Sequence, residues 1–141
     1  MQYDTRGMGR AFGSTKTTPE EGARAMKVYI SGKIGEEVLS EATRQKFAKA
    51  EAYLREWNFE VFNPTTSGLG LRAEELAREN GTDFYTEIMK LDLAELAWCD
   101  AIYMLTDWTD SPGAKREYAE ASKLGLAIWY EDNKNVYGEL Q

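Results

Sequence analysis

The sequence predicts an α/β protein of three layers, in which helices cover both faces of a central parallel sheet of four or five strands. Short apolar runs typical of buried strands alternate along the chain with segments of helical periodicity, and this alternation indicates a parallel sheet. The chain has 141 residues, which is enough for one such domain and too few for two ordinary ones. Apolar residues at 43% and charged residues at 29% are typical of a globular protein.

Four segments have the apolar, β-rich composition of short buried strands. The first is followed by Gly32, and the second is stopped by Asn63-Pro64. The strands are expected at residues 27–31, 59–62, 101–105 and 126–130.

The segments between these strands carry apolar residues at steps of three and four, as amphipathic helices do. Thr82 or Asp83 can cap the third of them, and Ser111 stands where the fourth begins. A glycine-rich loop at residues 67–70 precedes the second. The helices are expected at residues 36–57, 71–79, 82–98 and 111–124.

Residues 1–25 have many turn residues and no apolar period, which predicts a flexible N-terminal extension. They carry four basic and three acidic residues, a net charge of +1, whereas residues 26–141 carry 13 basic and 21 acidic residues, a net charge of −8. We therefore expect one folded domain over residues 26–141.

The chain has no histidine and one cysteine, Cys99. This composition excludes His-based triads, His-ligated zinc and an intrachain disulfide. The net charge of −7 disfavours nucleic acid polymers and anionic membranes as partners, because both require a basic face. No apolar stretch is long enough to span a membrane and the N-terminus lacks the core of a signal peptide, so a cytoplasmic location is expected.

Two carboxylates fall on helix faces that are otherwise apolar, and a buried carboxylate is costly unless it is paired or functional. Asp92 lies on the inward stripe of the helix before the third strand, and Glu117 on that of the helix after it. The stripes are Tyr85, Ile88, Met89, Leu93 and Leu96 in the first helix, and Ala114, Tyr118, Ala121 and Leu124 in the second.

Each carboxylate could instead have a purely structural role. Asp92 can reach a backbone donor or a basic side chain, and Glu117 can pair with Lys115 or Lys123 at a solvated edge. Taken together, two carboxylates near the carboxyl end of one strand suit the cleavage of a glycosidic bond, in which one attacks the anomeric carbon and the other manages the leaving group.

Of the two turns near these carboxylates, one has features of a ligand-binding loop and the other is ambiguous. The segment Ser111-Pro112-Gly113-Ala114 combines a capping hydroxyl, a proline suited to the first helical position and a glycine, which fits an anion site and equally an ordinary N-cap. The turn at residues 32–35 matches neither a dinucleotide-binding loop nor a Walker loop. We expect no cofactor and no metal.

Three motifs, taken in order, resemble the nucleoside 2-deoxyribosyltransferase superfamily. They are residues 28–34 (VYISGKI), Asp92-Leu93 followed by Cys99-Asp100-Ala101, and residues 111–117 (SPGAKRE). Within that superfamily, residues 26–130 are most similar to a small uncharacterised bacterial and phage group called DUF4406. The resemblance implies a flavodoxin- or Rossmann-like sandwich and a homodimer or larger homo-oligomer in which a neighbour completes each site.

The resemblance also implies roles for matching residues. Glu117 is similar to the glutamate that attacks the anomeric carbon, Tyr29 to the tyrosine that orients it, and Asp92 to the aspartate that handles the leaving base. Ser111 is similar to the phosphate-binding serine of hydrolases that act on deoxynucleoside 5′-monophosphates, where the transferases carry an acid. Gly35 departs from those hydrolases, which have a basic residue there. The residues expected to contact substrate are Gly32, Lys33, Ile34, Trp108, Ser111, Gly113 and Ala114.

Lys33, two places before Gly35, is the expected substitute for the missing basic residue. Trp108 is expected to stack on a base, although most of the four tryptophans are expected in the core.

The sequence favours a hydrolase of the N-glycosidic bond in (deoxy)nucleoside 5′-monophosphates that works through a covalent glycosyl–Glu117 intermediate. Deoxyribosyl transfer to a second base and a nucleotide-binding module without turnover are the alternatives. In each case the expected partner is a small nucleotide or nucleoside.

Overall fold

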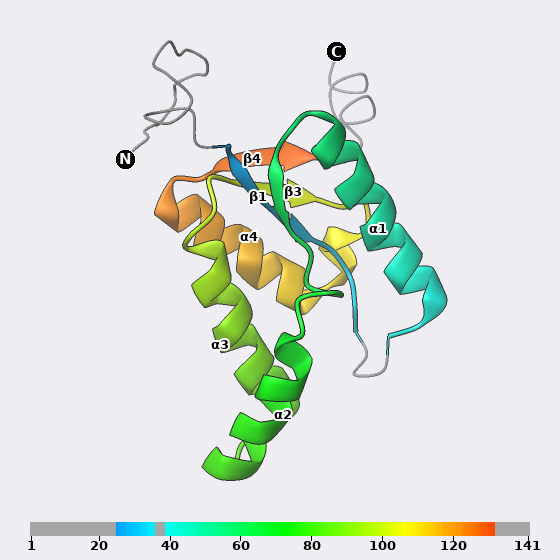
Figure 1. The fold of residues 1–141 in the computed structure, drawn as a ribbon. Coiled ribbons are helices and arrows are strands. Elements are labelled where there is room, and N and C mark those ends of the chain that lie inside the picture. Colours follow the sequence, from blue (N-terminus) through cyan, green and yellow to red (C-terminus); the bar gives the residue numbers. More distant parts are fainter. Residues whose placement is uncertain (1–24, 36–38, 132–141) are drawn as a thin grey trace.

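A computed structural model describes residues 25–35 and 39–131 of the chain. In that part of the protein, four strands form one all-parallel sheet in the order β2-β1-β3-β4, with helices on both faces (Figure 1). The strands are β1 (Lys27–Ser31), β2 (Glu60–Phe62), β3 (Ala101–Met104) and β4 (Ala127–Tyr130). The predicted α/β sandwich is therefore confirmed, with four strands among the described residues. Residues 1–24 lie outside these ranges, so the N-terminal extension stays a prediction.

The helices alternate with the strands as the periodicity predicts. They are α1 (Glu41–Glu56), α2 (Leu69–Asn80), α3 (Phe84–Leu96), the short 3-10 helix η1 (Trp108–Asp110) and α4 (Pro112–Leu124). Figure 1 shows α1 on one face of the sheet and α3 and α4 on the other, while α2 and the start of α3 extend beyond the sheet. No helix within residues 25–35 and 39–131 is both long and apolar enough to cross a membrane.

Side-chain alternation along the two central strands divides the core into two halves. Val28 and Ile30 of β1 pack with Phe47, Ala50 and Leu54 of α1. Tyr29, between them, points to the opposite face. There it packs with a second group of buried residues from α3, α4, β3 and the α3–β3 turn, namely Leu96, Cys99, Ile102, Met104 and Ala121. Because the side-chain period of a strand is two, Ser31 lies on the same face as Tyr29.

Helices α1 and α2 begin at other residues than expected. Helix α1 begins at Glu41 rather than at residue 36, because the Ser40 hydroxyl accepts a hydrogen bond from the Thr43 N–H at 3.1 Å and caps the helix there. Helix α2 begins at Leu69, inside the stretch expected to be a loop. Its N-cap is Gly68, whose φ of 80° lies in the left-handed region that glycine adopts without strain.

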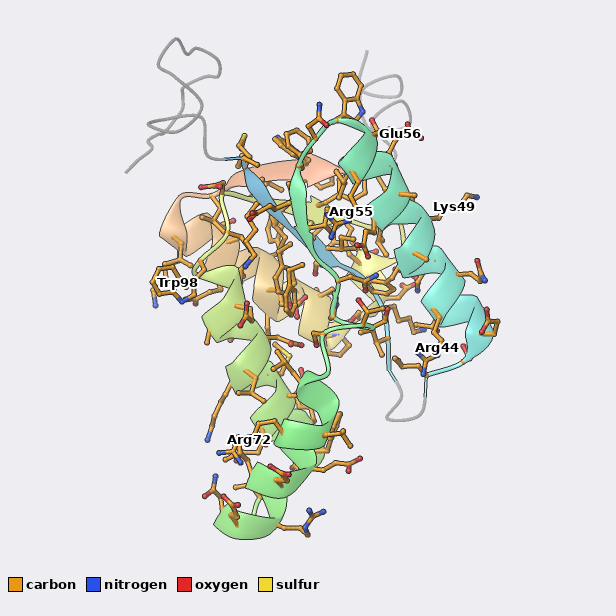
Figure 2. All side chains as sticks on the ribbon, in the orientation of Figure 1. Arg44, Lys49, Arg55, Glu56, Arg72 and Trp98 are labelled. Atoms are coloured by element: carbon orange, nitrogen blue, oxygen red, sulfur yellow. The ribbon has the colours of Figure 1, made fainter. Side chains whose placement is uncertain are left out.

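The helices bury narrower stripes than the sequence pattern suggests. Tyr85 and Leu124, both expected to face inward, are 45% and 43% exposed. The expectation that most tryptophans are core residues is wrong. Trp57 and Trp98 are 62% and 78% exposed because each follows the last turn of its helix, and Figure 2 shows Trp98 at the surface. Trp108 and Trp129 are half-buried. The outer side of α1 is charged, as Figure 2 shows at Arg44, Lys49, Arg55 and Glu56.

Candidate active site

The fold brings the three residues of the predicted catalytic set to one region. Tyr29 lies in β1, Asp92 in α3 and Glu117 in the second turn of α4. Helices α3 and α4 cover the same face of the sheet, and parallel strands end at a common edge. All three residues are buried, with exposed fractions of 0%, 6% and 7%.

The Glu117 carboxylate receives two hydroxyl donors from β1, one on each oxygen. The Tyr29 hydroxyl donates to Oε2 at 2.7 Å, and the Ser31 hydroxyl donates to Oε1 at 2.6 Å. Short hydrogen bonds of this kind are typical of hydroxyl groups bound to an ionised carboxylate. Glu117 is therefore held in the interior by β1, and the alternative of a solvated ion pair with Lys115 or Lys123 does not describe it.

Packing fixes the donors of these hydrogen bonds. The Tyr29 ring stacks on Phe62 of β2 with a centroid separation of 5.0 Å, so the phenol has no room to swing away.

Cys99 packs in the same group of residues, and burial raises the pKa of its thiol to about 12. A thiol that stays protonated at neutral pH is a poor nucleophile, so Glu117 is the better candidate in this region.

Opposing effects set the ionisation of Glu117. Burial raises the pKa of this carboxyl to about 7, while the hydrogen bonds from Ser31 and Tyr29 favour the charged form and limit the rise. The pKa of Tyr29 is raised well above its usual value, mainly by burial and next by the charges of Glu117 and Asp92, so the phenol remains a donor. A substantial fraction of Glu117 is thus ionised near neutral pH.

Asp92 is buried like Glu117 but differs from it in its hydrogen bonding. Its side chain is 6% exposed, and its Oδ1 atom is buried without a hydrogen-bond partner among the described residues. Burial raises the pKa of Asp92 to about 8, and the nearby charges of Glu117 and Glu95 add to the rise. Among the residues that the structure describes, the expected structural partner is therefore missing at this oxygen. A buried polar atom without a partner is costly, which makes this oxygen a candidate functional group.

The start of α4 has the capping geometry that its sequence predicts. The Ser111 hydroxyl accepts a hydrogen bond from the Ala114 N–H at 3.1 Å, and Pro112 occupies the first helical position. Ser111 and Ala114 are buried, whereas Gly113 is half-buried. A Cβ atom on Gly113 would lie 3.5 Å from the Met89 sulfur, an ordinary contact, so packing does not require glycine here. Anion binding at this helix start stays a prediction.

Packing explains why a glycine, Gly32, follows β1. A Cβ atom on Gly32 would lie 2.7 Å from Cδ1 of Leu105, which is too close for two carbon atoms. Ile34, two residues on, packs against the apolar group on the α1 face. These contacts explain Gly32 and Ile34 without a ligand, so their role in substrate binding stays a prediction.

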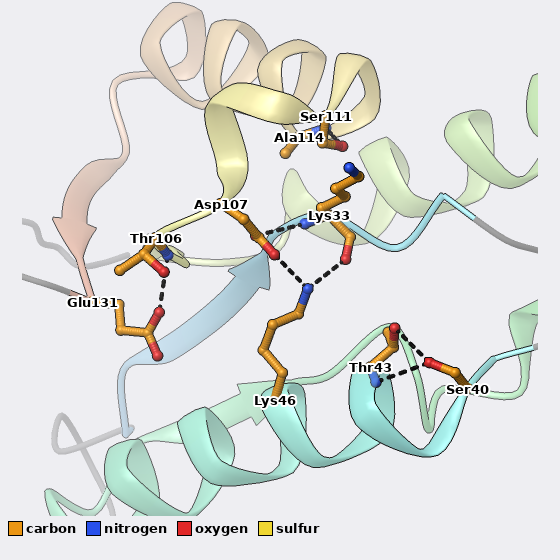
Figure 3. A network of polar contacts seen from close by, with 9 residues as sticks. All are labelled: Lys33, Ser40, Thr43, Lys46, Thr106, Asp107, Ser111, Ala114 and Glu131. Carbon is orange, nitrogen blue, oxygen red and sulfur yellow. Dashed lines mark hydrogen bonds and ion pairs between the residues drawn. The ribbon is translucent and has the colours of Figure 1, made fainter.

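A polar clamp holds the loop after β1 against the loop after β3. The Lys33 N–H donates to Oδ1 of Asp107 at 3.0 Å, and the Lys46 ammonium donates to the Lys33 carbonyl at 2.7 Å and to Oδ2 of Asp107 at 2.5 Å (Figure 3). The exposed Lys33 side chain extends in the direction of Ser111 and Ala114 at the start of α4 (Figure 3). The clamp thus fixes the backbone that carries the Lys33 side chain.

We expect Lys46→Met to loosen this clamp, because methionine keeps the unbranched stem of the side chain but lacks the ammonium group and donates no hydrogen bond. Loss of partly exposed charged contacts should cost about 1 kcal/mol, and exchange of the Lys33 amide should become about fivefold faster. Hydrogen exchange of a peptide covering residues 32–35 measures this change. Lys49→Met, on the outer side of the same helix, is the matched control (Figure 2). Equal exchange in the two variants would contradict the clamp.

Trp108 is less available to a ligand than expected. Its ring stacks on Tyr118 of α4 at 4.8 Å between centroids, and Tyr130 of β4 lies at 6.5 Å. Tyr118 therefore covers one face of the Trp108 ring, so a base could stack only on the other face. Stacking on a base stays a prediction.

The fold and this arrangement define an α/β protein with a buried carboxyl pair at one end of its sheet. The family model described as "Domain of unknown function (DUF4406)" matches residues 26–130, so the chain belongs to the DUF4406 family. No curated protein matches the chain. In the described part of the chain, no three His, Cys, Asp or Glu residues form a group that could hold a metal ion.

Proposed function

We propose that this protein hydrolyses the N-glycosidic bond of (deoxy)nucleoside 5′-monophosphates. One observation carries the proposal: Glu117 is buried and held by two hydroxyl donors, and a second buried carboxyl group, Asp92, lies near enough to sense its charge. One oxygen of Asp92 has no hydrogen-bond partner within the part of the chain that the structure describes. An oriented carboxylate beside a protonated carboxylic acid is the arrangement that double-displacement cleavage of a glycosidic bond requires.

In the first step, a carboxylate oxygen of Glu117 forms a bond to the anomeric carbon while the bond from that carbon to the base nitrogen breaks. The electron pair of the broken bond goes to the base, which takes the proton of Asp92. In the second step, water attacks the anomeric carbon, its proton returns to Asp92, and Glu117 leaves as the carboxylate. The products are the free base and the sugar phosphate, and both carboxyl groups regain their starting states.

The phosphate is assigned to the start of α4. The N-terminus of a helix carries a partial positive charge that favours an anion, and Lys33 extends toward this helix start. Ser111 also carries the sequence resemblance to hydrolases of nucleoside monophosphates. Local dipoles and one lysine would then hold the phosphate, in a chain whose net charge is −7.

The test is to incubate the protein with each deoxynucleoside 5′-monophosphate and its unphosphorylated nucleoside, and to follow free base by chromatography. Base release from a monophosphate, with slower release from the matching nucleoside, supports the proposal. No release from any compound, at enzyme concentrations near that of the substrate, contradicts it. New nucleoside formed on addition of an acceptor base would reassign the protein as a transferase, because the same glycosyl intermediate then passes to the base instead of water.

The pH dependence follows from the two carboxyl groups. Activity needs Glu117 ionised, so kcat/KM should rise as the pH passes the Glu117 pKa of about 7. It also needs Asp92 protonated, so kcat/KM should fall as the pH passes the Asp92 pKa of about 8. A profile measured from about pH 5 to about pH 10 should therefore be a narrow bell, whose limbs belong to the coupled pair. A profile that is flat over this range would exclude these residues as base and acid.

A further inference from the structure

Strand β1 presents two hydroxyl groups to Glu117, and the sequence resemblance gives a role to Tyr29 but none to Ser31. Tyr29 and Ser31 stand two residues apart, so their side chains lie on the same face of the strand. The Ser31 hydroxyl makes the shorter hydrogen bond, at 2.6 Å against 2.7 Å for Tyr29, and it reaches the other carboxylate oxygen. Ser31 is 1% exposed, so water does not replace this contact.

The position of Ser31 is fixed by its backbone. Ser31 pairs with Met104 in the register of β1 and β3, and its carbonyl accepts a hydrogen bond from the Leu105 N–H at 2.8 Å. The hydroxyl therefore projects from one of the two central strands of the sheet. A carboxylate held at one oxygen can still turn about its last side-chain bond, whereas a carboxylate held at both oxygens by one rigid strand cannot.

We propose that Ser31 is a positioning residue for Glu117, and that its hydroxyl fixes the plane of the carboxylate that attacks the anomeric carbon. This inference rests on the proposed function, in which Glu117 is the nucleophile. In the second chemical step Glu117 leaves the sugar as a carboxylate. A donor on the charged oxygen stabilises that leaving group, so the Ser31 hydroxyl assists both formation and breakdown of the intermediate.

Two hydroxyl groups of β1 act on Glu117, and Glu117 in turn acts on a third group, on α3. They are the Ser31 and Tyr29 hydroxyls of β1, which favour the charged form, and Asp92 of α3, whose pKa the charge of Glu117 raises. Of these, Ser31 can be removed with the smallest change in volume, because Ser31→Ala deletes one oxygen atom. This substitution isolates the hydrogen bond from the packing.

The experiment compares the wild-type protein with Ser31→Ala and with Ser31→Thr, which keeps a hydroxyl group. The Glu117 carboxyl is titrated by carbon-13 NMR without substrate. In Ser31→Ala its pKa should rise by about 1 unit, because a hydrogen bond to the charged form is lost. The ionised fraction at pH 7 then falls from about one half to about one tenth, so kcat/KM at pH 7 should fall about fivefold, in kcat rather than in KM. Ser31→Thr should restore the wild-type titration.

Ser122→Ala, at an exposed serine of α4, is the matched control and should change neither the titration nor the rate. If Ser31→Ala does not fold, Ser31→Cys carries the same test, because its thiol is a weak donor. An unchanged Glu117 titration in the folded variant would overturn the inference. A shifted titration together with no base release by the wild-type protein would contradict the proposed function and still support Ser31 as the group that holds Glu117.

Discussion

Glu117→Gln is expected to abolish base release, by on the order of 10³-fold or more, while the fold stays intact. Glutamine has the size of glutamate, and its amide can accept a hydrogen bond from the Tyr29 hydroxyl and donate one to the Ser31 oxygen. It cannot form the glycosyl ester. Release of base, followed by chromatography, measures the loss, and binding of a deoxynucleoside 5′-monophosphate, followed by calorimetry, should change little.

The stability of this variant separates catalysis from folding. Because burial raises the pKa of Glu117 from about 4.5 to about 7, ionised Glu117 costs stability as the pH rises through this window. Neutral glutamine avoids that cost, so the melting temperature at pH 8 should be no lower than that of the wild type. Glu120→Gln, one turn further along α4, is the control and should keep full activity. Full activity in Glu117→Gln would remove Glu117 from the mechanism.

Asp92→Asn should make the protein more stable and much less active. The variant removes the buried acid, whose Oδ1 atom has no hydrogen bond to lose among the described residues. We expect a gain in the free energy of unfolding of about 1–3 kcal/mol at pH 8, a rise of several °C in the melting temperature. Base release should fall about 10²-fold or more, because the leaving base loses its proton donor.

The stabilisation should depend on pH in a definite direction. The pKa of Asp92 is raised from about 3.8 to about 8 in the folded protein, so its protonated form favours folding. That contribution is fully present below about pH 4 and is lost as the pH rises toward 8. The difference in melting temperature between the variant and the wild type should therefore grow over this range. Glu74→Gln, at an exposed acid of α2, should show no such growth. A variant that is equally destabilised at every pH would show that Asp92 is a structural residue.

Much of the fold could be predicted because local pattern and tertiary structure agree. The apolar run at residues 27–31 and the helical spacing after it correspond to β1 and α1 within a few residues. The differences between prediction and structure lie at helix starts whose positions are set by capping residues. Ser40 caps the start of α1 with its own hydroxyl, and Gly68 starts α2 from a left-handed conformation that glycine reaches in loops and caps alike. The spacing of hydrophobic residues carries no signal of either capping effect.

The candidate site was predictable where a residue breaks a pattern. Asp92 and Glu117 interrupt apolar stripes, and both are buried. Ser31 breaks no pattern, because a small residue at the end of a strand is common, although its spacing of two from Tyr29 places both on one face. The clamp of Lys46 and Asp107 joins residues 61 positions apart, and such pairs follow only from the tertiary structure. The Asp92 oxygen that has no partner among the described residues likewise depends on what α3 and α4 place around it.

The central claim is that Glu117 becomes covalently bound to the sugar during turnover. The most direct measurement is to quench the protein with acid during its first turnover of a deoxynucleoside 5′-monophosphate, digest it, and weigh its peptides by mass spectrometry. We predict one added deoxyribosyl phosphate on the peptide that contains Glu117, and no added mass in Glu117→Gln. Released base with an unmodified Glu117 peptide, or a sugar on another residue, would contradict the claim.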